Sequence, residues 1–148
     1  KDFILDEVQI LEARAAGASA VLLIVRALSP ERLHGLVRSA AAWGLDALVE
    51  AHDRGELAVA LDCGARLIGV NSRDLDTFRI DTAGAWEIIR SVPREVLAVA
   101  ESGMASRADV EAAAAAGADA VLMGTALSAA RDPAALLGMI TGVARHAR

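Results

Sequence analysis

The chain has 148 residues, of which 55% are hydrophobic and 24% charged, so it can form one globular domain spanning residues 1–148. Its formal net charge of -5, without a cluster of lysine and arginine, argues against a nucleic-acid partner. No apolar run reaches the roughly 18 residues that a membrane span needs. The N-terminus is unlike a signal peptide, and a single cysteine suits a reducing compartment. We therefore expect no membrane partner and a cytoplasmic location.

Helical periodicity and short apolar runs alternate along the chain. In chain order, helices are predicted at Asp6–Ala16, Pro30–Trp43, Asp53–Cys63, Thr82–Ser91, Arg107–Ala116 and Pro133–Arg145. Strands are predicted at Ala20–Val25, Ala47–Glu50, Leu67–Asn71, Leu97–Glu101 and Ala120–Met123. Four of the helices are followed by a glycine that can end them in the left-handed conformation, at Gly17, Gly44, Gly64 and Gly117. Strict alternation of this kind predicts a parallel sheet with right-handed crossovers.

Four of the predicted strands end on polar or glycine residues, namely Glu50, Asn71, Glu101 and Gly124. Parallel strands deliver such residues to a shared rim, which is where a (β/α)8 TIM barrel carries out its chemistry. An eight-unit barrel needs about 250 residues. We therefore predict an α/β fold with an incomplete barrel, comprising about strands 3–8 with the first units missing and two sheet edges exposed. An open doubly wound sheet is the alternative, but the chain has no Gly-x-Gly-x-x-Gly after a first strand.

The last two strands are each followed by residues suited to binding phosphate. Ser102 and Gly103 follow one strand, and Gly124 and Thr125 follow the next. Many barrels hold phosphate in the loops after their last two strands and at the N-terminus of a short extra helix. The alternative is structural, with Ser102 and Gly103 in a turn and Thr125 capping a helix.

Glu50 and Glu101 follow apolar runs, where a carboxylate is costly without a partner. Two carboxylates on one rim favour acid-base work or binding of substrate hydroxyls, although either could belong to a structural ion pair. Asn71 could orient a substrate or bond the backbone of its own turn, and Arg73 could form a local ion pair with Asp74. The histidines lack ligand spacing, so no metal site is expected.

These residues resemble indole-3-glycerol phosphate synthase. The resemblance covers the chain in order and lies in Lys1-Asp2-Phe3-Ile4, Ala20–Val25, Leu48-Val49-Glu50, Ile68–Leu75, Ala100–Gly103 and Met123–Leu127. It implies a carboxy-lyase of tryptophan biosynthesis that closes the ring of 1-(2-carboxyphenylamino)-1-deoxyribulose 5-phosphate, losing carbon dioxide and water without a cofactor. The partners that it implies are this small phosphorylated substrate and, by association, other enzymes of the pathway.

The resemblance also implies residue roles. Lys1 matches the general acid that protonates the ribulose carbonyl, and Glu50 matches its acid-base or charge-stabilising partner. The remaining matches are Asn71, Arg73, Glu101, Ser102 and Leu122 for substrate binding, and Gly103, Gly124 and Thr125 for phosphate binding. The family often has serine where Thr125 stands, so the hydroxyl is kept.

The family's first-strand Glu-x-Lys pair and a nearby phosphate-binding serine do not occur in this sequence. The resemblance therefore implies that this chain alone has little or no turnover. Two alternatives remain: a non-catalytic phosphate-binding barrel fragment, and another phosphate-binding barrel enzyme such as phosphoribosylanthranilate isomerase or the tryptophan synthase alpha chain. The run from Asn71 to Leu75 and the start Lys1-Asp2-Phe3 argue against both of these enzymes.

Overall fold

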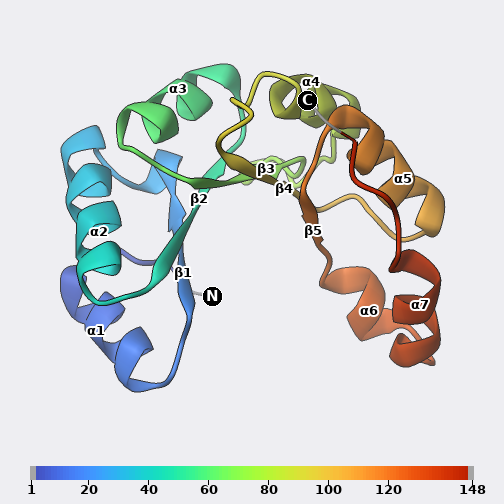
Figure 1. Ribbon diagram of the computed structural model, residues 1–148, viewed down its shortest axis with the longest axis horizontal. Helices are drawn as coiled ribbons and strands as arrows, with labels where there is room; N and C mark the ends of the chain where they lie inside the picture. The colour runs from blue at the N-terminus through green and yellow to red at the C-terminus, as the bar shows by residue number, and fades with distance from the viewer. Residues whose placement is uncertain (1–2, 147–148) are drawn as a thin grey trace. The chain divides into compact units, whose positions relative to one another are not determined.

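A computed structural model describes residues 3–146 and shows helices and strands in alternation (Figure 1). The helices are α1 (Glu7–Ala15), α2 (Pro30–Ala42), α3 (Arg54–Asp62), α4 (Thr82–Ile89), α5 (Arg107–Ala116), α6 (Thr125–Ala129) and α7 (Pro133–Ile140), with a 3-10 turn η1 (Val25–Ala27). The strands are β1 (Ala20–Ile24), β2 (Asp46–Ala51), β3 (Leu67–Asn71), β4 (Leu97–Glu101) and β5 (Ala120–Leu122).

The five strands form one sheet in the order β1-β2-β3-β4-β5, and the pairs β1–β2 and β4–β5 are parallel. Each strand therefore lies beside the next strand in sequence, as in a (β/α)8 barrel. A doubly wound sheet would instead reverse its strand order at a switch point. The strand order favours the predicted barrel over the doubly wound alternative. The backbone divides into two compact units. The first ends at Gly69, and the second begins at Val70.

The first unit packs its helices on β1 and β2. Apolar residues of α2 recur at Leu33, Leu36 and Ala40, and all three are fully buried because this face packs against both strands. In the parallel register of the strands, Leu23 lies opposite Val49, and both are also fully buried. This unit contains α1, α2 and α3, and α1 lies alongside α2 (Figure 1).

The second unit is built on the buried strand β4 and the alanine-rich helix α5. Ala98 and Ala100 of β4 and Ala113 of α5 are fully buried. α5 contacts α4, β5 and α7, and α4 contacts β4 (Figure 1). Small side chains allow these close contacts, which explains how the domain builds its core with few aromatic residues.

The ends of the elements follow the sequence predictions closely. The predicted bounds of β3, β4 and α5 match the structure, and Ser29 caps α2 by accepting a hydrogen bond from the Arg32 backbone N at 3.3 Å. The glycines after α1, α2, α3 and α5 all have the predicted positive φ. The turn η1 was not predicted, and β1 ends one residue early because Val25 begins this turn.

The last helix is shorter than the sequence predicted. α7 ends at Ile140 and not at Arg145. Gly142 has a φ of 73°, and Arg107 of α5 donates through Nη1 to the carbonyls of Met139 at 2.9 Å and Thr141 at 3.1 Å. These contacts give the terminal carbonyls a partner from another helix, so the chain leaves the helical path there.

The helices within residues 3–146 are all too short or too polar to cross a membrane. In the same range, the His, Cys, Asp and Glu side chains form no cluster of three or more that could hold a metal ion.

Candidate active site

In the first unit, Glu50 is the penultimate residue of β2. Its register partner in β1 is Ile24, and Glu50 is only 4% exposed. A carboxylate at this depth needs partners, because burial costs the charged form several kcal/mol unless other groups compensate. The structure places His52 against Glu50 as one such partner.

A row of four side chains runs from Arg26 to Glu50. Arg26 Nε donates to Glu56 Oε1 at 2.8 Å, and the other oxygen of Glu56 lies 3.0 Å from His52 Nδ1. His52 Nε2 lies 3.2 Å from Glu50 Oε1, a close contact of opposite charges that lacks hydrogen-bond geometry. The row joins η1, the first turn of α3, the residue after β2 and the end of β2 itself.

The charges of this row are coupled. Burial disfavours the charged imidazole, but the contacts with Glu50 and Glu56 outweigh it and raise the pKa of His52 from 6.5 to about 9. Burial also disfavours the Glu56 carboxylate, yet the hydrogen bonds from His52 and Arg26 lower the pKa of Glu56 from 4.5 to about 2. At neutral pH His52 is therefore a buried cation next to Glu50.

The spacing of three members of this row is visible in the sequence. Glu50, His52 and Glu56 follow one another within seven residues, and a glutamate in the first turn of a helix also favours that helix through its dipole. Arg26 could not be found in this way, because η1 brings it near from 30 residues away.

In the second unit, β3 and β4 end side by side. Ser72, the residue after β3, donates to the carbonyl of Glu101 through both its backbone N at 3.0 Å and its Oγ at 3.1 Å. Asn71 accepts a hydrogen bond from the Arg73 backbone N at 3.0 Å, so it bonds its own turn as the structural alternative supposed. Glu101 is only 3% exposed. Ser72 is a buried member of this site that was not singled out in the sequence.

The two residues after β4 both have a left-handed backbone. Ser102 has a φ of 63° and Gly103 a φ of 73°. A non-glycine residue in this region costs on the order of 1–3 kcal/mol and is found preferentially at functional sites. A Cβ on Gly103 would lie 2.7 Å from Thr82 Cγ2 and 2.8 Å from Ile80 Cγ2. The close approach at Gly103 is therefore to the protein's own chain at the start of α4 and just before it.

The strand β5 ends next to Glu101. Leu122 is the register partner of Glu101 and is 50% exposed. Gly124 is the residue before α6, and Thr125 is the first residue of this short helix, so Thr125 does not occupy the capping position. No side chain caps α6, and a Cβ added at Gly124 would meet nothing within 4 Å.

The structure thus brings most of the predicted site residues together in the second unit. Asn71 ends β3 and Arg73 lies two residues later, Glu101 ends β4 and Ser102 follows it, and Leu122 ends the adjacent β5. Glu50 belongs to the first unit, and Lys1 lies outside the described residues. Their roles in binding and catalysis remain predictions.

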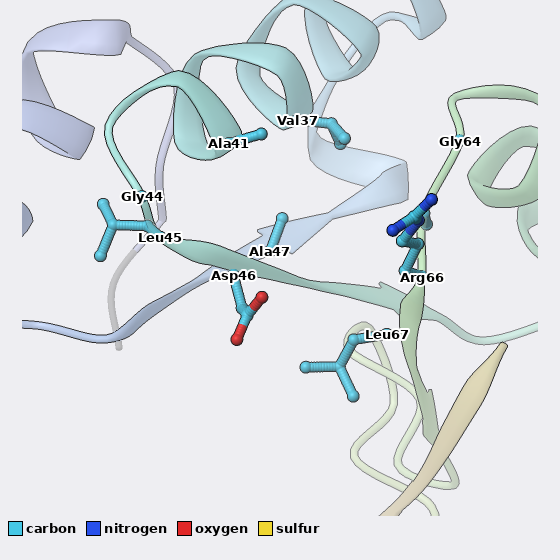
Figure 2. Close-up of a pocket in the computed structure, with 10 residues that line it drawn as sticks. Val37, Ala41, Gly44, Leu45, Asp46, Ala47, Gly64, Arg66 and Leu67 are labelled. Carbon is cyan, nitrogen blue, oxygen red and sulfur yellow. The ribbon is translucent and has the colours of Figure 1, made fainter.

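A cavity of about 500 Å³ in the first unit lies at the amino ends of β2 and β3, away from Glu50 (Figure 2). Its lining includes Val37 and Ala41 of α2, Asp46 at the start of β2, and Arg66 and Leu67 at the start of β3. Val37 and Ala41 lie on the helix side of the strands, whereas the side chains of Asp46 and Leu67 point away from that helix (Figure 2). Because barrel chemistry takes place at the carboxyl ends of the strands, we do not assign the active site to this cavity.

Parallel strands in sequence order, each followed by a helix, with polar residues at their carboxyl ends, define a protein of the (β/α)-barrel class. Solved structures agree: 3-hexulose-6-phosphate synthase from Salmonella typhimurium has a TM-score of 0.77 at 22% identity, covering 95% of this chain and 69% of that one. A mandelate oxidase mutant with an FMN adduct has a TM-score of 0.69 at 20% identity, covering 93% and 53%. At these identities the likeness shows the fold alone, and it confirms the predicted fold class.

The family model described as indole-3-glycerol phosphate synthase matches residues 1–138. Curated proteins of this name match from Opitutus terrae, at 51% identity over 93% of this chain and 52% of that protein, and from Leptospira interrogans, at 51% over 75% and 44%. A protein named indole-3-glycerol phosphate synthase 2 from Streptomyces coelicolor is 49% identical over 96% and 55%. The chain belongs to the indole-3-glycerol phosphate synthase family, and it spans about half the length of these relatives.

Proposed function

We propose that the protein containing this chain is an indole-3-glycerol phosphate synthase, a lyase of tryptophan biosynthesis. The observation that carries the proposal is the family match over residues 1–138. The reaction would convert 1-(2-carboxyphenylamino)-1-deoxyribulose 5-phosphate to indole-3-glycerol phosphate. It is supported by residues at or just after the carboxyl ends of β2, β3, β4 and β5, namely Glu50, Asn71, Glu101 and Gly124, because a ring closure on a phosphorylated sugar needs acid-base groups and a phosphate site.

The proposed chemistry needs one proton donor and one partner that stabilises charge. A carbon–carbon bond forms between the aromatic ring and the ribulose carbonyl carbon, while the carbonyl oxygen takes a proton from Lys1. Carbon dioxide then leaves the ring carbon, and its bonding electrons restore the aromatic ring. The new hydroxyl takes a proton and leaves as water, while the neighbouring carbon loses a proton to form the double bond of the indole. Glu50 would exchange protons or stabilise the positive charge that develops during these steps, since its buried carboxylate is held next to the cation His52.

The remaining residues would bind the substrate. We assign its hydroxyls and anthranilate side to Asn71, Arg73, Glu101, Ser102 and Leu122. We assign its phosphate to Gly103, Gly124 and Thr125, where the absence of a side-chain cap leaves the first turn of α6 accessible to an anion. No cofactor enters this scheme.

The proposal extends to the location and partners of the protein, which would work in the cytoplasm in association with other enzymes of tryptophan biosynthesis. The 148-residue chain by itself would turn over little, because the family's Glu-x-Lys pair is not in this sequence. An assay of indole formation by the chain alone tests the last statement directly.

Complementation tests the proposed function. The complete gene containing this sequence is expressed in a tryptophan auxotroph that lacks this synthase, together with versions carrying Lys1→Ala and Glu50→Gln. We expect the unsubstituted gene to restore growth and both substitutions to reduce it, since general acid-base groups typically contribute about 10²–10⁴-fold in rate.

Glu87→Gln serves as the matched control, because Glu87 is exposed on α4. Purified proteins are then assayed for the indole product. A complete protein that binds glycerol phosphates but forms no indole would be a non-catalytic binding protein, and growth unaffected by either substitution would overturn the roles of Lys1 and Glu50.

A further inference from the structure

His52 is buried more deeply than its polar character would suggest. Its side chain is 4% exposed and that of Glu50 is 5% exposed, whereas Glu56 and Arg26 are 13% and 29% exposed. The row therefore runs from a partly solvated arginine inward to a buried carboxylate at a strand end. The histidine is the member that contacts this carboxylate.

Glu56 fixes the orientation of the His52 ring. One carboxylate oxygen of Glu56 accepts from the His52 backbone N at 2.7 Å and lies 3.0 Å from His52 Nδ1. Both contacts come from one oxygen, so the ring cannot turn without breaking the second. A carboxylate next to Nδ1 requires a proton on Nδ1.

The other ring nitrogen then faces Glu50. If His52 were neutral with its proton on Nδ1, the electron-rich Nε2 would lie 3.2 Å from Glu50 Oε1 with no positive charge to offset a carboxylate. A second proton, on Nε2, gives the ring a positive charge and makes the contact attractive, although it lacks hydrogen-bond geometry. Among residues 3–146, the charged groups that act on the ring are Glu50 on β2, Glu56 on α3 and Arg26 on η1, and of these Arg26 opposes a positive ring.

We propose that His52 is a positioning residue for Glu50. Held by Glu56, its ring orients the Glu50 carboxylate at the end of β2 and presents a positive charge to it. The inference rests on the proposed role of Glu50 in the synthase reaction. It also gives roles to Glu56 and Arg26, because Glu56 holds the His52 ring and Arg26 Nε donates to Glu56.

Two substitutions of His52 separate its contributions in the complete protein. The amide of His52→Gln can place an uncharged N–H group near the position of Nε2, and the shorter His52→Asn can replace only the Nδ1 donor. We expect kcat to fall about ten- to a hundred-fold in His52→Asn, with KM changed less than about twofold, because misplacing a reacting group by about 1 Å can cost 10²-fold. His52→Gln should recover part of this loss, and in both variants the acidic limb of the kcat profile should move to higher pH, since the cation beside Glu50 is gone.

His34→Gln is the matched control, because His34 is an exposed histidine on α2. Glu56→Gln provides a second route to the same result, since it leaves His52 in place and removes the charge that holds it. Unchanged kcat and an unchanged pH profile in His52→Asn, His52→Gln and Glu56→Gln would overturn the inference. The same holds if every loss is matched by an equal loss of folded protein in circular dichroism.

A measurement without substrate separates this inference from the proposed function. NMR of the imidazole nitrogens follows the protonation of His52 in the unsubstituted protein and in Glu50→Gln and Glu56→Gln. We expect His52 to lose its proton at lower pH in both variants. If Glu50→Gln leaves the titration of His52 unchanged, the contact does not exist and the inference fails. If the titration shifts but Glu50→Gln keeps full activity, Glu50 has no role in catalysis. His52 would then contact Glu50 without contributing to the reaction.

Discussion

Gly103 shows how a single residue constrains the candidate site. Its φ of 73° disfavours any side chain, and a Cβ would meet Thr82, Ile80 and Ser72 within 3.0 Å. Ser72 is also the residue that donates twice to the Glu101 carbonyl. The turn after β4, which contains Gly103, therefore packs tightly against the segment that follows the neighbouring strand β3.

This coupling predicts a large effect of one added methyl group. Gly103→Ala should lower the free energy of unfolding by about 2–4 kcal/mol, which sums the costs of the left-handed backbone and of overpacking. Gly17→Ala is the control, because Gly17 has a φ of 87° but nothing within 4 Å of an added Cβ. It should cost only the backbone part, about 1–2 kcal/mol. Urea denaturation of both variants measures the difference, and equal losses would contradict the steric argument.

At the scale of elements, α3 is stabilised by the residue that caps its N-terminus. Asp53 caps this helix by accepting a hydrogen bond from the Glu56 backbone N at 2.8 Å. The same first turn carries the Glu56 side chain that orients His52. The cap therefore supports both a helix and the row of charges that leads to Glu50.

Removing the cap should affect both. We expect Asp53→Ala to lower the free energy of unfolding by about 1 kcal/mol, the typical value for loss of an N-cap. Asp62→Ala is the control, since Asp62 is exposed at the opposite end of α3, where a negative charge opposes the helix dipole. This second substitution should be neutral or slightly stabilising in the same urea measurement. A loss of about the same size at Asp62 would show that capping is not the cause.

Local chemistry explains which elements the sequence could predict. Caps at Ser29 and Asp53 and glycines such as Gly117 are local signals, so the helices that they bound were predicted within one residue at most ends. The helix α7 was predicted too long, although Gly142 with its positive φ follows its end as Gly117 follows α5; the bonds from Arg107 to its last carbonyls come from more than 30 residues away and have no local signal. Glu50 was predicted from its place after an apolar run, whereas the contact between His52 and Glu50 requires side-chain orientations that no pattern shows.

At the scale of the whole molecule, the His52–Glu56 pair makes stability depend on pH. The folded-state pKa of His52 is raised from 6.5 to about 9, so its stabilisation is complete below pH 6.5 and is lost as the pH rises through 9. The pKa of Glu56 is lowered from 4.5 to about 2, so its stabilisation is present above pH 4.5 and is lost as the pH falls through 2. The pair therefore stabilises the fold fully between about pH 4.5 and 6.5.

We expect the stability advantage of the unsubstituted protein over His52→Gln to shrink steadily from pH 6 to pH 10. Thermal unfolding of the two proteins across this range measures the advantage as a difference in Tm. His34→Gln, with its exposed site, should show a constant difference from the unsubstituted protein over the same range. A His52→Gln difference that stays constant or grows with pH would contradict the sign of this linkage.

The cavity at the start of β2 has a practical consequence. Asp46 and Glu50 lie at opposite ends of one strand, four residues and therefore about 13 Å apart. Arg66 lines the cavity and is exposed, while the protein's single cysteine, Cys63, is buried. A thiol introduced by Arg66→Cys would accordingly accept a fluorophore or a surface tether in preference to Cys63. It would provide a labelling site at the amino end of β3 in the first unit, away from the carboxyl end of β2, which stays open to small molecules.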